Sequence, residues 1–483
     1  MDFGFARWFF LRGLALVYGI AFFSYSTQVL GLIGEQGILP ARELLEAVSP
    51  YAGQGAYHRL PTFFWLRSDD LFLQGLCWAG IGLSVLLFFG LSPVPILFLL
   101  WALYLSLANV SQEFLSYQWD ALLLEAGFLG IFLAPLTLRW KPNHPPPDPP
   151  RIAVWGFWWL LFRLVFSSGM VKLSSADPTW WNLSALLCHY QTQPLPTWIG
   201  WFAHQLPAWF QKVSCILMFG IELGVPFLIF APRKLRIAAC LLLVAFQLLI
   251  MATGNYSFFN WLTILLCMLL LDDGVWTRFF FRKSVPSAAS RSSREWPRWI
   301  LVPALLLWFA VSWVRLGDVL RRPIPWPRPL QQLAEWIAPF HIDNGYGLFA
   351  VMTTSRPEII LEGSENGQEW KVYEFRYKPG DLGHPPGFVA PHQPRLDWQM
   401  WFAALDSYQA NPWFLRFCVK LLEGSPTVSA LLKKNPFPGR PPRYLRATVW
   451  DYRFTDLAGL RREGKWWKST RRGLYCPILS LRN

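Results

Sequence analysis

Five ionisable residues lie within or at the ends of long apolar stretches of the sequence: Asp120, Glu125, Arg163, Lys172 and Glu222. A charge at the centre of a membrane-spanning helix costs roughly 2.5–3.5 kcal/mol, so such residues are usually paired and are candidates for function. Depth estimated from the 1.5 Å rise per helical residue places Lys172 beside Asp120. The same estimate places Arg163 level with Glu125 and Glu222.

Lys172 is the best single catalytic candidate, although no catalytic residue is assigned. If Lys172 lined a cavity, burial would favour its neutral amine, which can act as a general base. The alternatives are a structural ion pair within the bundle and a side chain that snorkels to the interface. We favour the structural ion pair.

The loop Ser174–Pro207 is dense in indole, imidazole and amide groups. This composition suits a binding surface or the mouth of a cavity, and an interfacial aromatic belt is the alternative. His189 and His204 are 15 residues apart without a third ligand at a suitable spacing, so no metal is expected. The candidate binding residues of this loop are Trp180, Trp181, Asn182, His189, Tyr190 and Gln193.

A second candidate binding segment is Phe388–Leu405, which contains His392, Arg395, Asp397 and Trp398. A carboxylate near a helix start is first an electrostatic or capping group. No GxSxG nucleophile elbow accompanies the His and Asp, so roles in folding or in partner contact are favoured over hydrolysis. Phosphate-loop and dinucleotide fingerprints are lacking from the sequence, and no cofactor is expected.

The composition of the chain indicates which kind of element positions these residues. Of the 483 residues, 53% are hydrophobic and only 15% are charged, which indicates residence in the lipid bilayer. The net charge is +14. The basic residues gather at the ends of apolar runs, as topology determinants do, and this excludes a nucleic-acid partner.

About 20 apolar residues cross the hydrocarbon core. The basic loops 139–151, 232–234 and 273–298 alternate with loops poor in Lys and Arg, which predicts a cytoplasmic N-terminus and an extracytoplasmic chain after residue 316. The transmembrane domain is therefore 1–316. Its nine predicted spans are 12–34, 71–90, 94–110, 118–138, 152–173, 208–231, 235–253, 257–272 and 299–316.

The remainder is predicted to be a Pro-rich extended connector, 317–340, and an α+β domain, 341–483. Asn366-Gly367 between two strand-like segments, Glu358–Gly363 and Trp370–Tyr377, indicates a β-hairpin. Alternation predicts a further strand, and helical patterns predict three helices. If the domain is extracytoplasmic, a Cys418–Cys476 disulfide is an open alternative. The predicted strand is Tyr444–Thr455, and the helices are Asp397–Leu405, Pro412–Glu423 and Pro426–Lys433.

Eight stretches of the sequence resemble the lipase maturation factor family of polytopic membrane proteins. The resemblance implies a chaperone-like protein that helps secreted lipases reach an active fold, without covalent chemistry. In animals the family resides in the endoplasmic reticulum with its tail domain in the lumen. The resembling motifs are Gly31–Pro40, Phe114–Pro135, Phe162–Pro196, Asn255–Leu262, Asn344–Phe349, Arg356–Tyr377, Phe388–Leu405 and Asn435–Phe437.

The chain ends Ser480-Leu481-Arg482-Asn483 without a retention signal for the endoplasmic reticulum. We therefore expect a bacterial inner-membrane protein with a periplasmic tail, or a luminal tail if the source is eukaryotic. A shorter stretch, Gly169–Leu173, is similar to the segment of vitamin K-dependent γ-carboxylases that contains their catalytic lysine. This resemblance implies the alternative function, a carboxylase-like membrane enzyme with Lys172 as the base.

Overall fold

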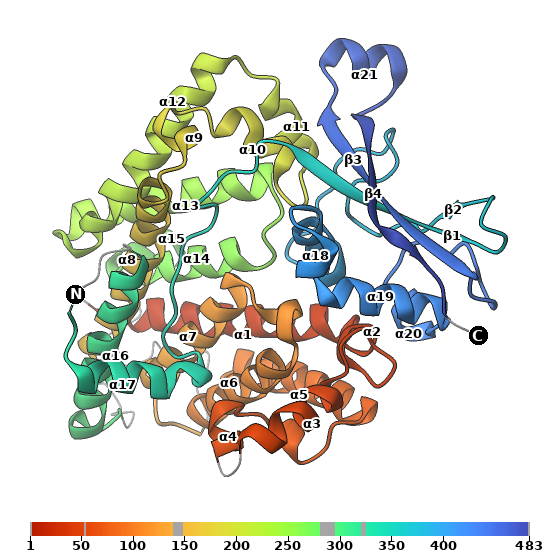
Figure 1. The fold of residues 1–483 in the computed structure, drawn as a ribbon. Helices are drawn as coiled ribbons and strands as arrows, with labels where there is room; N and C mark the ends of the chain where they lie inside the picture. The colour runs from red at the N-terminus through yellow and green to blue at the C-terminus, as the bar shows by residue number, and fades with distance from the viewer. Residues whose placement is uncertain (1, 53–54, 139–147, 281–294, 320–324, 482–483) are drawn as a thin grey trace.

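The protein is a bundle of apolar helices with a C-terminal α+β tail (Figure 1). The computed structural model describes residues 2–52, 55–138, 148–280, 295–319 and 325–481. Among these, seven helices are long and apolar enough to cross a membrane, which confirms a multi-pass membrane fold. They are α1 (Gly4–Ser26), α5 (Asp70–Phe88), α6 (Pro93–Val110), α8 (Arg151–Ser174), the segment Ala208–Phe230, α13 (Arg233–Thr253) and α16 (Arg298–Val319).

The first span begins earlier than the sequence predicts. Helix α1 starts at Gly4 and ends at Ser26, and a separate short helix, α2 (Val29–Ile33), follows it. Arg7 and Arg12 interrupt the apolar pattern and misled the prediction of 12–34. Both are buried, and Arg7 forms an ion pair with Glu295 at 3.0 Å.

Two predicted spans, 118–138 and 257–272, form shorter helices. Helix α7 (Gln118–Leu133) has 16 residues and α14 (Phe259–Met268) has 10, less than a straight crossing needs. Both pack against other helices of the bundle and are largely buried. The count of nine crossings therefore stays a prediction.

Short helices cover the ends of the bundle. The predicted extended connector is partly wrong, because Arg328–Ile337 forms helix α17, with Pro329 in its first turn. Pro323, the Pro-rich loop at 142–147 and the basic stretch 281–294 lie outside the described residues. The remaining short helices are α3 (Ala41–Ala52), α4 (Ala56–Arg59), α9 (Pro178–Trp181), α10 (Leu186–Thr192), α11 (Trp198–His204) and α15 (Asp273–Phe280). Helix α12 (Ala208–Phe219) is the first part of the candidate span Ala208–Phe230.

The tail contains a four-stranded antiparallel sheet in the order β2-β1-β3-β4. The predicted hairpin is confirmed, with Gly367 at φ +76° in its turn, although β2 is only two residues long. Strand β4 was not predicted, because a basic run together with Gly473 and Pro477 hides its alternation. The strands are β1 (Arg356–Ser364), β2 (Lys371–Val372), β3 (Tyr444–Phe454) and β4 (Trp467–Leu479).

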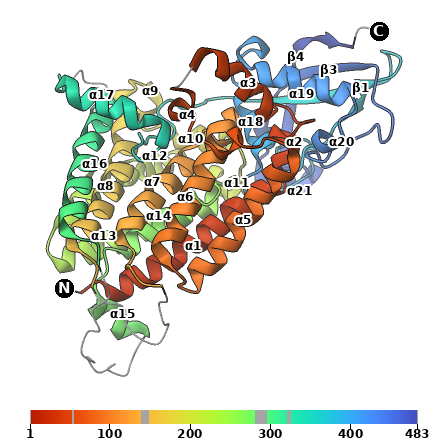
Figure 2. The same cartoon turned by 90° about the horizontal axis from the view of Figure 1, so that it is seen from below.

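Four helices complete the tail: α18 (Arg395–Ala404), α19 (Pro412–Leu422), α20 (Pro426–Ser429) and α21 (Leu457–Glu463). The first two agree with prediction within two residues at each end, whereas α20 is four residues shorter than predicted. Cys418 and Cys476 are buried and free. Figure 2 shows the tail at the opposite end of the bundle from the N-terminus and α15.

Candidate functional site

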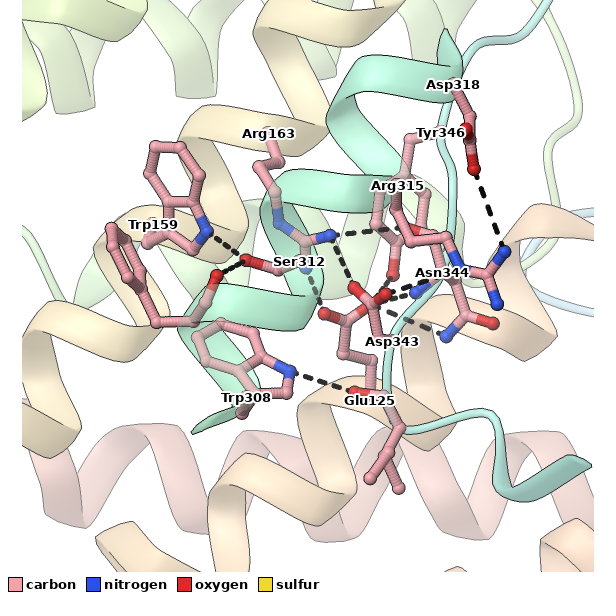
Figure 3. Close-up of polar contacts among 12 residues, drawn as sticks. Glu125, Trp159, Arg163, Trp308, Ser312, Arg315, Asp318, Asp343, Asn344 and Tyr346 are labelled. Carbon is pink, nitrogen blue, oxygen red and sulfur yellow. Dashed lines mark hydrogen bonds and ion pairs between the residues drawn. The ribbon is translucent and has the colours of Figure 1, made fainter. Parts of the chain in front are cut away.

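The charged residues of the bundle meet the tail in two buried clusters. In the first, the Arg163 guanidinium lies between two carboxylates, Glu125 of α7 and Asp343, which follows the connector (Figure 3). Its Nη1 is 2.9 Å from Asp343 Oδ1, and Nη2 hydrogen-bonds Glu125. Arg315 reaches Asp343 at 3.4 Å, so the four charges sum to zero. Of the two partners predicted for Arg163, Glu125 is the one that it contacts, whereas Glu222 pairs with Lys172.

The segment Asn344–Phe349 enters the bundle at this cluster. The Asn344 amide and the Tyr346 hydroxyl both donate to Glu125 Oε2, at 3.1 and 2.6 Å. Gly347 lies so close to Val171 of α8 that an added Cβ would meet it at 2.5 Å. The segment Asn344–Phe349, which carries the family resemblance, therefore fills a gap between α7 and α8.

The second cluster joins the bundle to helix α18. Arg395 makes a two-pronged ion pair with Asp120, at 2.5 and 2.8 Å, and donates to the Phe114 carbonyl at 3.0 Å. The Tyr104 hydroxyl also donates to Asp120, at 2.5 Å. Both charged side chains are about 1% exposed. Two-pronged Arg–carboxylate pairs are among the strongest and most directional polar contacts in proteins, so this pair fixes the position of the tail.

Lys172 does not pair with Asp120, and that prediction is wrong. The Lys172 ammonium contacts both oxygens of Glu222, at 2.9 and 2.8 Å. Depth along the membrane normal, on which the prediction was based, does not determine which helices face each other. Asp120 faces the tail, and a residue 275 positions later in the chain is its partner.

Glu222 reaches Lys172 because its helix changes winding. After α12 the backbone forms a π-helical turn, Gly220–Gly224, and then a 3-10 helix, Val225–Phe230. Such turns occur frequently at functional sites. A cavity of about 520 Å³ lies beside the Lys172–Glu222 pair.

The predicted binding residues of the loop 174–207 do not form one site in the structure. Three of them line the cavity: Trp180, His189 and Tyr190. Trp181 and Asn182 are exposed on the outside. Burial and the nearby Lys172 charge lower the pKa of His189 to about 4, so its ring is neutral. Gln193 is buried and donates to the Thr253 carbonyl at 2.7 Å.

The predicted binding residues of the tail lie at or near the junction with the bundle, where His392 is half-buried and the other three are buried. Burial first, and then the charges of Arg395 and Arg376, lower the pKa of His392 to about 4. Its Nδ1 is 2.9 Å from Ser24 Oγ in α1. Asp397 accepts from the amides of Tyr377 and Lys378, at 2.8 and 2.9 Å. Trp398 is buried too, so this segment holds the tail together and against the bundle.

Four residues of these networks were missed by sequence reasoning: Asp343, Arg315, Arg356 and Glu358. Arg356 donates to the carbonyls of Gln191, Gln193 and Pro194 and pairs with Glu358 at 2.7 Å, which anchors β1 to the loop. Arg315 could have been found, since it is a basic residue inside a predicted span. Asp343 and Arg356 lie in the tail, where charged residues are ordinary and carry no signal.

The tail carries a groove of its own, about 450 Å³ in volume, beside the sheet. Its lining combines Val372 and Trp450 with charged side chains, among them Glu362 and Lys378. Within the described ranges, no cluster of three His, Cys, Asp or Glu side chains could hold a metal ion. The geometry offers apolar and polar surfaces for binding.

The fold and the two clusters define a class: a multi-pass membrane protein whose C-terminal α+β domain is fixed to its helical bundle by buried ion pairs. Residues 5–278 match the model of the lipase maturation factor transmembrane domain, and residues 342–477 match that of the lipase maturation factor C-terminal domain. The chain belongs to the lipase maturation factor family.

Individual relatives match over nearly the whole chain. Lipase maturation factor 2 of Homo sapiens is 35% identical over 98% of this chain and 82% of its own length. Lipase maturation factor 2 of Xenopus tropicalis is 35% identical, over 96% and 80%, and lipase maturation factor 1 of Mus musculus is 37% identical, over 98% and 86%. No solved structure matches the chain. Nothing in these relatives or in the Lys172–Glu222 salt bridge supports the carboxylase-like alternative.

Proposed function

We propose that this chain assists the maturation of secreted lipases, as a chaperone-like membrane protein whose tail contacts the client. The observation that carries the proposal is the match to lipase maturation factors over both the bundle and the tail. Binding and release of an unfolded segment requires no covalent step, and the sites described above need none.

The groove beside the sheet is the surface that we assign to the client. Its mixture of exposed apolar and charged side chains suits an extended, incompletely folded segment. Val372 lies in the groove and is 44% exposed. Ile478, in strand β4 of the same sheet, is 52% exposed and lies outside the groove, and it therefore provides a matched control.

The proposal is tested in cells that lack their own lipase maturation factor and secrete a lipase. Expression of this chain should raise the activity of the secreted lipase per unit of lipase mass. Val372→Glu places a charge in the groove and should weaken that rescue about tenfold, which corresponds to about 1.4 kcal/mol of binding. Ile478→Glu should rescue as well as the unaltered chain. Equal rescue by both variants would show that the groove is not the client site. If the unaltered chain gave no rescue, the proposed role in lipase maturation would be wrong.

We further propose that the tail lies on the extracytoplasmic side, in the periplasm of a bacterium or in the lumen of the endoplasmic reticulum. The basic loops support this orientation. So does the position of the tail at the end of the bundle opposite to the N-terminus (Figure 2). Seven crossings and nine crossings both place the two ends of the chain on opposite sides.

A carboxyl-terminal reporter that fluoresces only in the cytosol is expected to stay dark on this protein. The same reporter at the amino terminus should be bright, which controls for expression and folding. A bright carboxyl-terminal fusion would invert the topology and separate the tail from any secreted client.

A further inference from the structure

The cavity beside Lys172 lies in the membrane-embedded part of the protein and is separate from the tail groove. It is enclosed by α8, α12, α13, α14 and the short helices α9 to α11, and most of its lining side chains are apolar. A volume of about 520 Å³ falls within the range of small-molecule sites, roughly 300–1,000 Å³.

Three apolar side chains connect the cavity with the outer surface of the bundle. Phe202 of α11, Phe210 of α12 and Leu249 of α13 line the cavity and are also exposed on the outer surface of the bundle. Helices α12 and α13 belong to candidate membrane spans, so apolar side chains exposed there meet lipid rather than water. A ligand that enters between these helices comes from the bilayer.

The polar end of the cavity is electrically neutral. The Lys172 ammonium is matched by both oxygens of Glu222, and the Asn260 amide donates to Gln247 Oε1 at 2.7 Å. An anionic head group would have to approach the Glu222 carboxylate, and a cationic one the Lys172 ammonium. The Lys172–Glu222 pair therefore favours an uncharged head group.

Two further features indicate a ligand rather than a packing defect. The π-helical turn carries Glu222, whose side chain lines the cavity. His189 also lines the cavity near Lys172, and its imidazole places a polar ring among the apolar walls.

We propose that this cavity binds a single-chain neutral lipid of the monoacylglycerol type. The acyl chain lies against the apolar walls between α12 and α13. The hydroxyl and ester groups lie near His189 and the Lys172–Glu222 pair. This inference rests on the bundle and on Leu348 and Phe349, which complete the wall of the cavity. It does not depend on the proposed role in lipase maturation.

The competing explanation is that the Lys172–Glu222 ion pair only stabilises the packing of α8 against the irregular segment after α12. Gly169 permits that close approach, because an added Cβ would lie 2.7 Å from the Leu223 side chain. Under that explanation the cavity carries no ligand, and filling it changes no binding measurement.

The test uses the purified full chain in lipid nanodiscs and a monoacylglycerol with a photoreactive group in its acyl chain. Cross-linked peptides should come from α11, α12 and α13, and unlabelled monooleoylglycerol should compete. Ser214→Trp fills the cavity from α12 and should reduce labelling at least tenfold. Val213→Trp adds the same side chain at the neighbouring exposed position, outside the lining, and should leave labelling unchanged.

A charge experiment tests the head group. Monooleoylglycerol phosphate, whose head group is anionic, should compete at least tenfold less well than monooleoylglycerol in the unaltered protein. Glu222→Gln leaves Lys172 without its counter-charge and should reverse that preference. Equal labelling of Ser214→Trp and Val213→Trp proteins would overturn the site. Equal competition by the neutral and anionic lipids in the unaltered protein would overturn the neutral head group.

Discussion

Replacing Arg395 with Met is expected to lower the free energy of unfolding by about 3–5 kcal/mol, because it leaves Asp120 charged and buried without its partner. Asp120 would retain the Tyr104 hydroxyl, which is too weak to replace a guanidinium with two hydrogen bonds. Thermal and denaturant unfolding in nanodiscs, followed by the fluorescence of the tryptophans, measures this change.

The control is a second ion pair across the same junction. Arg416 of α19 contacts Glu43 of α3, but both side chains are 52% exposed, so Arg416→Met should cost at most about 1 kcal/mol. In the double variant Asp120→Leu and Arg395→Met, neither charge is left alone, and much of the lost stability should return. If Arg395→Met costs no more than Arg416→Met, the buried pair does not hold the tail.

The elements that could be predicted from the sequence are those whose pattern is local. Apolar runs of about 20 residues identify α5, α6, α8, α13 and α16, with ends within three residues of those observed. The hairpin at Asn366-Gly367 follows from the turn that this pair favours. In each case the information lies within one short stretch of chain.

Contacts between distant segments could not be predicted in the same way. The partner of Lys172 depends on the rotation of each helix about its axis and on the π-helical turn near Glu222, and neither is encoded by hydropathy. Strand β4 was missed because it is an edge strand, where Lys468, Arg471 and Pro477 can face solvent without cost. Its irregular pattern suits an edge, but it cannot be recognised as a strand from alternation.

Loss of Arg163 should have an effect at least as large as loss of Arg395. In Arg163→Met, the carboxylates of Glu125 and Asp343 remain buried on either side of an apolar side chain, and only the partly exposed Arg315 still faces Asp343. We expect a loss of at least about 3–5 kcal/mol. Because Asn344 and Tyr346 both donate to Glu125, repulsion at this site should also release the segment Asn344–Phe349 from the bundle.

Hydrogen exchange in the segment Asn344–Phe349 separates this local release from general destabilisation. The Asn344 amide, which donates to Glu125, should exchange at least tenfold faster in Arg163→Met protein, while amides in the middle of α5 keep their protection. Arg315→Met removes only the outer, 30%-exposed cation and should leave the Asn344 amide protected. The double variant Glu125→Gln and Arg163→Met keeps an acceptor for Asn344 and Tyr346, so it should recover protection. Equal exchange in the single and double variants would show that the Arg163 side chain, and not charge balance at Glu125, holds the segment Asn344–Phe349 in place.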